Sequence, residues 1–181
     1  MSKPALLLID VQKGFDEPYW GQRNNPHAEA HIARLLAAWR QAQRPIIHVR
    51  HCSTEPNSPL RPERPGNAFK DEAQPLPGEI QFSKTVNSAF IGTDLEAYLR
   101  EQVITDLVIV GLTTDHCVST TTRMAANLGF TVTLVEDATA TFDRKYNGRY
   151  YTADEIHQTN LASLHGEFCT VRPTAAILNE I

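Results

Sequence analysis

Three residues with complementary chemistry each lie at or after the end of a predicted strand: Asp10, Lys84 and Cys117. A thiol becomes a nucleophile once it loses its proton, a carboxylate can take that proton, and a nearby ammonium favours the resulting thiolate. Each residue type also has a common structural role, because cysteine fills buried space, aspartate caps turns and lysine lies in solvent. Together they form the set that a cysteine hydrolase requires, so we take them as the candidate catalytic residues.

The sequence around Cys117 predicts a strand followed directly by a helix. Residues 107–110 are apolar and mostly β-branched, which is typical of a strand buried on both faces. Beyond Gly111 come short polar residues, and apolar positions then recur at helical spacing as far as the glycine at position 129. Cys117 is therefore expected in the first helical turn, where free N–H groups and the helix dipole favour a thiolate. Asp115 is expected to cap this helix.

The rest of the chain alternates apolar runs of strand length with amphipathic segments of helix length. This alternation predicts right-handed βαβ units, and hence an α/β, three-layer α-β-α, Rossmann-like fold with a mostly parallel sheet of about six strands. Because ligands of such sheets bind beyond the carboxyl ends of the strands, Asp10, Lys84 and Cys117 are expected on one rim. The predicted strands are 5–9, 46–49, 79–82, 107–110, 131–135 and 168–171, and the predicted helices are 28–43, 93–102, the segment after Cys117, 153–165 and 174–181.

We expect a single domain over residues 1–181. A Pro-rich excursion at 53–78 has neither helical nor strand periodicity and holds more than half of the chain's 11 prolines. Long segments of this kind in compact domains are usually functional or disordered, and this one is either a lid or a subunit contact. The segment containing Tyr146-Asn147-Gly148 is expected to be a loop.

The composition excludes several classes of protein. Lys and Arg total 17 and Asp and Glu total 21, which gives a net charge of −4 with no basic cluster to bind nucleic acid. Cys52, Cys117 and Cys169 are widely spaced and form no CxxC pair, which argues against a disulfide framework or a zinc site and fits a reducing compartment. The apolar run at 5–9 is too short for a signal-peptide core or a membrane span. We therefore expect a cytoplasmic protein that acts on a small molecule and binds neither nucleic acid nor membranes.

Three segments resemble the signature segments of the isochorismatase-like cysteine hydrolases, in the order in which they occur in that superfamily. They are Leu7-Leu8-Ile9-Asp10-Val11-Gln12-Lys13-Gly14-Phe15, Lys84-Thr85-Val86-Asn87-Ser88-Ala89-Phe90 and Gly111-Leu112-Thr113-Thr114-Asp115-His116-Cys117-Val118. The superfamily includes nicotinamidases, N-carbamoylsarcosine amidases, ureidoacrylate amidohydrolases and isochorismatases. The resemblance implies the isochorismatase-like hydrolase fold, a homo-oligomer (dimer or tetramer) and a catalytic triad of Asp10, Lys84 and Cys117. It also implies a cis peptide bond between Leu112 and Thr113, with the backbone N–H groups of Thr113 and Cys117 forming an oxyanion hole.

The sequence differs from two branches of this superfamily, the nicotinamidases and the isochorismatases, and these differences indicate which reaction to expect. Nicotinamidases bind a divalent metal through an Asp-x-His element, but the corresponding stretch here, His48-Val49-Arg50-His51-Cys52, contains no aspartate. His48 and His51 are expected on opposite faces of a strand, so we predict no metal and no cofactor. Isochorismatases cleave an enol ether, and the cysteine is replaced in them, so the presence of Cys117 favours hydrolysis of a C–N bond through a thioester.

Two other functions remain open at this stage. One is enol-ether hydrolysis of the isochorismatase type. The other is a non-catalytic, flavodoxin-like module that binds a small molecule, although the chain has neither a GxGxxG nor a GxxxxGK[ST] motif for a nucleotide. Candidate substrate-binding residues are Phe15, Tyr19, Trp20, Asn87 and Leu112; for the aromatic three, packing of their loop over the core is the competing role.

Overall fold

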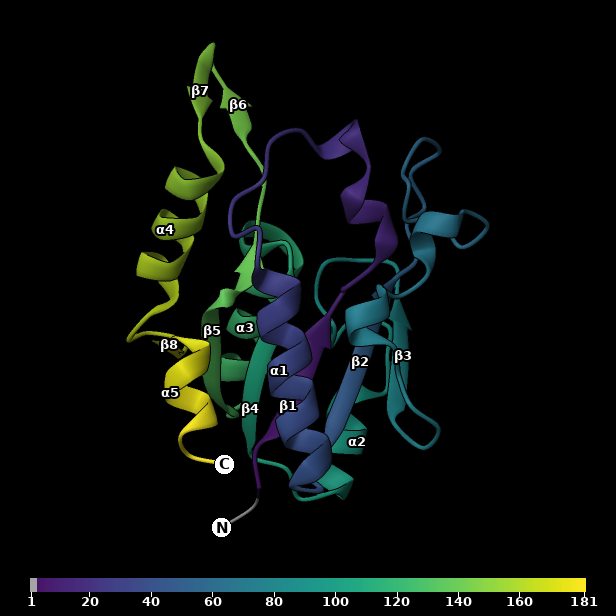
Figure 1. Ribbon diagram of the computed structural model, residues 1–181, viewed down its shortest axis with the longest axis vertical. Helices are drawn as coiled ribbons and strands as arrows, with labels where there is room; N and C mark the ends of the chain where they lie inside the picture. The colour runs from purple at the N-terminus through teal and green to yellow at the C-terminus, as the bar shows by residue number, and fades with distance from the viewer. Residues whose placement is uncertain (1–2) are drawn as a thin grey trace.

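A single parallel sheet forms the centre of the computed structural model, which describes residues 3–181. The strand order is β3-β2-β1-β4-β5-β8, and every neighbouring pair is parallel. The predicted α/β fold with a mostly parallel, six-stranded sheet is therefore confirmed (Figure 1). The strands are β1 (Ala5–Ile9), β2 (Ile46–His51), β3 (Ile80–Lys84), β4 (Asp106–Leu112), β5 (Thr131–Ala140) and β8 (Thr170–Arg172).

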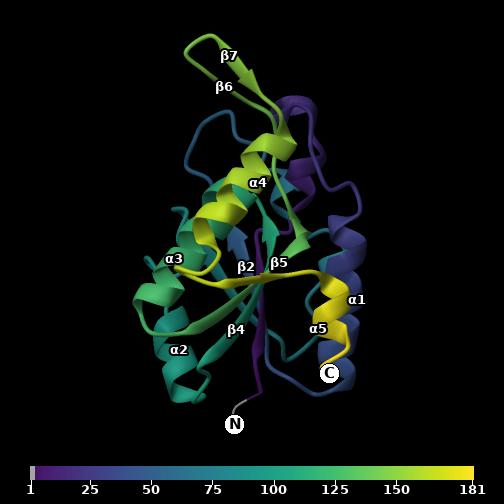
Figure 2. The ribbon, with the colours of Figure 1, turned by 90° about the vertical axis from the view of Figure 1, so that its left-hand side faces the viewer.

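Helices cover both faces of this sheet, as Figure 2 shows with the sheet seen near its edge. Helices α1 (Ala28–Gln41) and α5 (Thr174–Leu178) lie on one face. Helices α2 (Leu95–Glu101), α3 (Ser119–Asn127) and α4 (Ala153–Leu164) lie on the other. Alternate residues of β1 and β4 enter the two hydrophobic clusters, so these strands are buried on both sides, as their continuous apolar runs predict.

A glycine allows the two central strands to lie close together. Gly111 has φ 123°, and a Cβ atom built there would lie 2.0 Å from the carbonyl oxygen of Ile9. No side chain fits at that distance, and L-residues rarely adopt this φ. Gly111 thus brings the end of β4 against the end of β1, where Cys117 and Asp10 follow.

Strand β5 is longer than the sequence predicts. It continues through Glu136 and Asp137 to Ala140 after a register shift against β4 between Ile109 and Gly111. The prediction that it ends at 135 was wrong because these polar residues find partners inside the fold. The Asp137 carboxylate, for example, accepts hydrogen bonds from the backbone N–H and the hydroxyl of Thr174 at 2.8 and 2.7 Å.

The predicted loop around Asn147-Gly148 is instead a two-stranded hairpin. Strands β6 (Arg144–Tyr146) and β7 (Arg149–Tyr151) pair antiparallel and project from the body of the molecule, at the end remote from both termini (Figure 1). Asn147 and Gly148 have φ angles of 48° and 76°, and two positive values are what a tight type I′ hairpin turn requires.

The Pro-rich excursion at 53–78 is ordered and packs against the segment that follows β1. It contains two short 3-10 turns, Pro65–Asn67 and Asp71–Ala73. A Cβ atom at Gly66 would lie 2.8 Å from the Cα of Gly14, so two glycines allow the two segments to touch. Among residues 3–181, no helix is long and apolar enough to span a membrane.

Candidate active site

The structure brings Asp10, Lys84 and Cys117 together at the carboxyl ends of three strands. The Nζ of Lys84 lies 2.6 Å from Oδ2 of Asp10 and 3.3 Å from Sγ of Cys117. Asp10 and Lys84 are completely buried as side chains, whereas Cys117 keeps 8% of its surface exposed. Cys117 is therefore the most exposed of the three residues.

Local backbone geometry places each of the three side chains. Asp10 follows β1 with φ 52°, a left-handed conformation that aspartate tolerates better than most residues, and its N–H donates to the Val49 carbonyl at 2.9 Å. Lys84 is the last residue of β3, and its carbonyl accepts from the N–H of Cys52 at 2.7 Å. Cys117 lies in a short π-helical turn, Thr114–Val118, that leads into α3.

The turn between β4 and Cys117 contains the cis peptide bond that the family resemblance implies. The peptide bond between Leu112 and Thr113 is cis. The carbonyl of Thr113 accepts from the N–H groups of His116 and Val118, both at 3.2 Å, which fixes the turn around Cys117. Thr113 is the N-cap of this helical segment, and Cys117 lies within it.

One oxygen of the Asp10 carboxylate has no hydrogen-bond partner among residues 3–181. Oδ2 accepts from Lys84, but among residues 3–181 no group forms a hydrogen bond with the buried Oδ1. Buried carboxylate oxygens are nearly always bonded, so an open one beside a thiol needs an explanation. It leaves an acceptor free for a proton from Cys117 or from a water molecule.

The surroundings of Cys117 favour the neutral thiol in the resting protein. Burial raises the pKa of the thiol most, the negative charge of Asp10 raises it further, and Lys84 lowers it only in part. The sequence shows the helix start and the lysine, which favour a thiolate, but it does not show the burial beside a carboxylate, which opposes it.

His51 is a fourth member of the cluster that sequence reasoning missed. Its Nδ1 lies 3.1 Å from the Nζ of Lys84, because His51 and Lys84 are direct neighbours in the parallel pairing of β2 with β3. Burial and the charge of Lys84 lower the pKa of the imidazole, and Asp10 and the Val86 carbonyl oppose them. The signal was present in the sequence, since His51 ends β2 as Lys84 ends β3, but their pairing register was not.

The donor set does not fit a metal site of the nicotinamidase kind. His48 is fully buried with its Nε2 2.9 Å from Glu79, whereas His51 contacts Lys84 on the other face of β2. Within residues 3–181, Asp10, His51 and Cys117 have ligand atoms within 4.8 Å of one another, the spacing a metal ion would need. The Lys84 ammonium, however, hydrogen-bonds to all three, so a positive group already occupies the point on which they converge.

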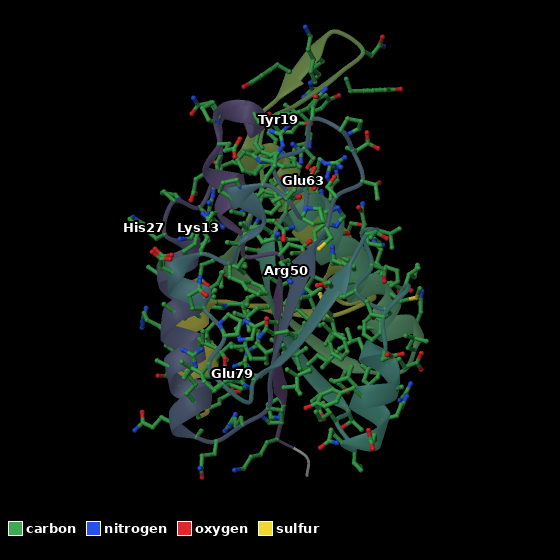
Figure 3. The ribbon with its side chains drawn as sticks, turned by 90° about the vertical axis from the view of Figure 1, so that its right-hand side faces the viewer. Lys13, Tyr19, His27, Arg50, Glu63 and Glu79 are labelled. Carbon is green, nitrogen blue, oxygen red and sulfur yellow. The ribbon has the colours of Figure 1, made fainter. Side chains whose placement is uncertain are left out.

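The candidate substrate-binding residues fall into two groups. Phe15 is 4% exposed and Leu112 fully buried, and both pack in one hydrophobic cluster, so their side chains support the turn and offer little surface to a ligand. Trp20 is half-buried, with a ring 4.9 Å from that of Phe15, and Tyr19 and Asn87 are exposed. In Figure 3, Tyr19 lies towards the hairpin end of the molecule and Glu79 towards the opposite end.

Asp115 does not cap the helix. Its carboxylate accepts from the hydroxyl of Thr141 and forms an ion pair with Arg144 at 2.8 Å, and these contacts lower its pKa although burial raises it. On the other side of the same turn, the hydroxyl of Thr114 lies 2.9 Å from Nδ1 of His157 in α4. The segment that carries Cys117 is therefore held by Thr141, which directly follows β5, by β6 and by α4.

Comparison with known proteins extends over nearly the whole chain. Residues 4–176 match the isochorismatase domain. The uncharacterized isochorismatase family protein YrdC of Bacillus subtilis is 48% identical over 98% of this chain and 96% of its own length. The crystal structure of an isochorismatase-family protein from Chromobacterium violaceum superimposes with a TM-score of 0.94 at 53% identity, covering 98% of this chain and 92% of that one. The ureidoacrylate amidohydrolase RutB of Rhizobium rhizogenes is 42% identical over 75% of this chain, which spans about half of that enzyme (51%).

Proposed function

We propose that this chain, which belongs to the isochorismatase family and is a hydrolase of that family, cleaves a C–N bond of a small amide, carbamoyl or ureido substrate. Cys117 is the nucleophile, Asp10 the general base and acid, and Lys84 the cation that holds the thiolate. The observation that carries this proposal is the contact of one buried ammonium with both a carboxylate and a thiol, at 2.6 and 3.3 Å.

The reaction begins with a proton transfer coupled to attack. The open Oδ1 of Asp10 takes the proton of Cys117 while the sulfur forms a bond to the substrate carbonyl carbon. Lys84 stabilises the negative charge that develops on sulfur. This contribution is needed because burial of the thiol opposes the formation of a charge there. Asp10 thereby becomes the neutral acid that the next step requires.

The tetrahedral intermediate places a negative charge on the former carbonyl oxygen. The backbone N–H groups of Thr113 and Cys117 are the donors for this oxygen, and such a donor typically contributes about 3–4 kcal/mol. Collapse of the intermediate breaks the C–N bond, and the proton on Asp10 passes to the leaving nitrogen. Ammonia or a small amine departs and a thioester remains on Cys117.

Water completes the cycle. Asp10, again a carboxylate, takes a proton from a water molecule that attacks the thioester carbonyl, and the C–S bond then breaks. The acid product leaves, and the thiolate recovers a proton from Asp10. No group other than substrate and water is consumed.

The substrate class rests on the chemistry of the nucleophile and on a relative. A cysteine nucleophile suits acyl transfer from a carbonyl, whereas an enol ether has no carbonyl at its cleaved bond. The relative RutB acts on ureidoacrylate, a compound with a C–N bond next to a carbonyl. The small exposed surface of Cys117 favours a compact substrate. Tyr19, Trp20 and Asn87 are the residues of our set that remain available to contact it.

A panel of primary amides, carbamoyl compounds and ureides, assayed for ammonia release, tests this function. Cys117→Ala serves as the inactive control, and Cys52→Ala as the matched control that keeps full activity. A parallel set with chelator is expected to give the same rates. Acyl-enzyme trapped by acid quenching should add the mass of the acyl group to Cys117. Cleavage of isochorismate with no amide hydrolysed, or full activity of Cys117→Ala, would contradict the thioester mechanism.

We also propose a homo-oligomer, as the family resemblance implies. Light scattering on the purified protein tests this point, and a monomer at micromolar concentration would contradict it.

A further inference from the structure

The ammonium group of Lys84 has three N–H bonds and three acceptors. They are Oδ2 of Asp10 at 2.6 Å, Nδ1 of His51 at 3.1 Å and Sγ of Cys117 at 3.3 Å. An ammonium has three protons to donate and no lone pair to accept with. Since Lys84 is buried, its three donors are used completely inside the protein, and His51 supplies the one acceptor that takes no part in the proposed reaction.

The position of His51 is fixed by its backbone as well as by its strand. A single buried glutamine, Gln12, accepts from the N–H of His51 at 2.8 Å and donates to its carbonyl at 3.0 Å. Asn67, from the Pro-rich excursion, donates to the same carbonyl at 3.0 Å. The end of β2 is thus clamped from two segments of the chain, and the imidazole is delivered to Lys84 with little freedom.

We propose that His51 is a positioning residue whose neutral Nδ1 accepts a proton of Lys84 and so holds the ammonium between Asp10 and Cys117. This inference rests on the roles of Lys84 and Cys117 proposed above. Without the third acceptor, the long lysine side chain can rotate one N–H bond away from the sulfur and still keep its bond to Asp10. The Lys84–Cys117 contact, the longest of the three, is then the one that weakens.

The charges around His51 require the neutral imidazole. The charged and titratable groups that face it are Lys84 from β3, Asp10 from β1 and Cys117 from the turn after β4. A protonated ring would have no lone pair on Nδ1 for Lys84 and would place two positive charges side by side. The lowered pKa of His51 agrees with this requirement.

Substitution of His51 by asparagine or by glutamine tests whether the hydrogen bond from Lys84 to Nδ1 matters. Asparagine carries its amide group near the position of Nδ1, and glutamine carries its amide near the position of Nε2. His51→Asn therefore keeps an acceptor for Lys84, whereas His51→Gln loses it. His48 uses Nε2 to contact Glu79, so the same pair of substitutions has the opposite consequence there and serves as an internal control.

The readout is the rate at which iodoacetamide alkylates Cys117, followed by mass spectrometry of the Cys117 peptide between pH 6 and 10. This measurement needs no substrate, so the inference can fail or succeed whether or not the amide panel identifies one. We expect His51→Gln to slow alkylation about 10- to 100-fold at pH 8, the usual size of an effect on a supporting partner, by moving the profile to higher pH. His51→Asn should stay within about threefold of the parent, and His48→Gln should match it. Equal rates for His51→Gln and the parent, or equal losses in His51→Gln and His51→Asn, would overturn the inference.

A second measurement uses the unmodified sequence and does not depend on the variants folding equally well. In protein labelled with ¹⁵N-histidine at neutral pH, His51 should give the spectrum of a neutral ring with the proton on Nε2 and a free Nδ1, and His51→Asn identifies its signals by their loss. A proton on Nδ1, or a charged ring at neutral pH, would contradict the proposed role.

Discussion

Strand β2 carries one histidine into each of two charged clusters on opposite faces of the sheet. The first, which we call the triad cluster, contains Asp10, Lys84, Cys117 and His51. The second, which we call the Glu79 cluster, contains Glu79, Arg40 and His48. Both pair a carboxylate with a cation and a histidine, yet their hydrogen bonding differs.

The carboxylate of Glu79 is fully used. It accepts from Nε and a terminal nitrogen of Arg40 at 2.7 and 2.9 Å, from His48 at 2.9 Å and from the N–H of Leu76 at 2.9 Å. Burial raises the pKa of Glu79, but these bonds outweigh burial and hold it at about 2. Asp10, by contrast, has one oxygen bonded and one open among the described residues.

Under the proposed mechanism, this difference separates a cluster that stabilises the fold from one whose free carboxylate oxygen can accept a proton. A saturated carboxylate cannot accept another proton without losing a bond, whereas a half-saturated one can. Burying an ion pair that is incompletely bonded costs stability, which is acceptable only where function requires it. Substitutions should therefore affect the two clusters in opposite ways.

The largest expected effect is the loss of activity when the triad cluster is neutralised. Asp10→Asn combined with Lys84→Met should lower kcat/KM by at least about 10⁴-fold, as removal of catalytic groups that act as a unit does. The free energy of unfolding should stay unchanged or rise by up to about 4 kcal/mol, because two buried charges disappear together. Steady-state assays on an amide from the panel and urea denaturation test both parts.

The matched control is the double variant Arg40→Met/Glu79→Gln, which removes the same number of charges from the Glu79 cluster. It should keep kcat/KM within about twofold and lose stability. An active triad double variant, or a triad variant that loses more stability than this control, would remove the distinction between the clusters.

The next effect in size is the loss of stability in Glu79→Gln alone. The amide replaces one accepting oxygen with a donor, so Arg40 and the N–H of Leu76 lose part of their bonding. We expect a loss of about 1–3 kcal/mol in the free energy of unfolding, with unchanged turnover. Glu63→Gln, which breaks an exposed ion pair with Arg61, should leave the urea midpoint where it is. A midpoint for Glu79→Gln equal to that of the parent would mean that this cluster contributes nothing.

This contrast also shows what the sequence could predict. The continuous apolar runs of β1 and β4 predict buried central strands. Asp10, Lys84 and Cys117 meet because each lies at, or just beyond, the carboxyl end of a parallel strand. Chain order and strand periodicity suffice for that much. They do not contain the register of β2 against β3, so the contact of His51 with Lys84 was not predictable. They also do not show how deeply Cys117 is buried beside Asp10, which raises the pKa of its thiol.

Two other features of the structure were not predicted from the sequence, for different reasons. The hairpin around Asn147-Gly148 was missed although its turn chemistry was in the sequence, since Asn-Gly favours the positive φ angles observed there. Asp115 is different: helix capping was the better local interpretation, and only the return of the chain to Arg144 provides its actual partner. The hairpin was therefore predictable from its Asn-Gly turn. The role of Asp115 was not, because it depends on a tertiary contact that leaves no local pattern in the sequence.

A third prediction concerns the titration of Cys117. Because the charge of Asp10 raises the pKa of the thiol and Lys84 lowers it, Asp10→Asn should move the alkylation profile to lower pH and Lys84→Met to higher pH. Identical profiles for the two variants would show that neither charge acts on the sulfur. Cys169, whose pKa burial raises to about 11, serves as an internal reference in the same digest.

The smallest effect, and the finest test of the Glu79 cluster, is on the dependence of stability on pH. The pKa of Glu79 is about 2 in the folded protein against an ordinary 4.5, so its contribution to stability is complete above about pH 4.5 and is lost as the pH falls towards 2. Glu79→Gln should therefore flatten the decline of the urea midpoint between pH 5 and pH 3. The decline should not vanish, because Glu29 also has a pKa of about 2: its ion pairs with Arg23 and Lys70 outweigh a burial that would raise it. Addition of Glu29→Gln should flatten the curve further. If Glu79→Gln lowers the midpoint equally at pH 3 and pH 7, the carboxylate stabilises the fold through packing and not through its charge.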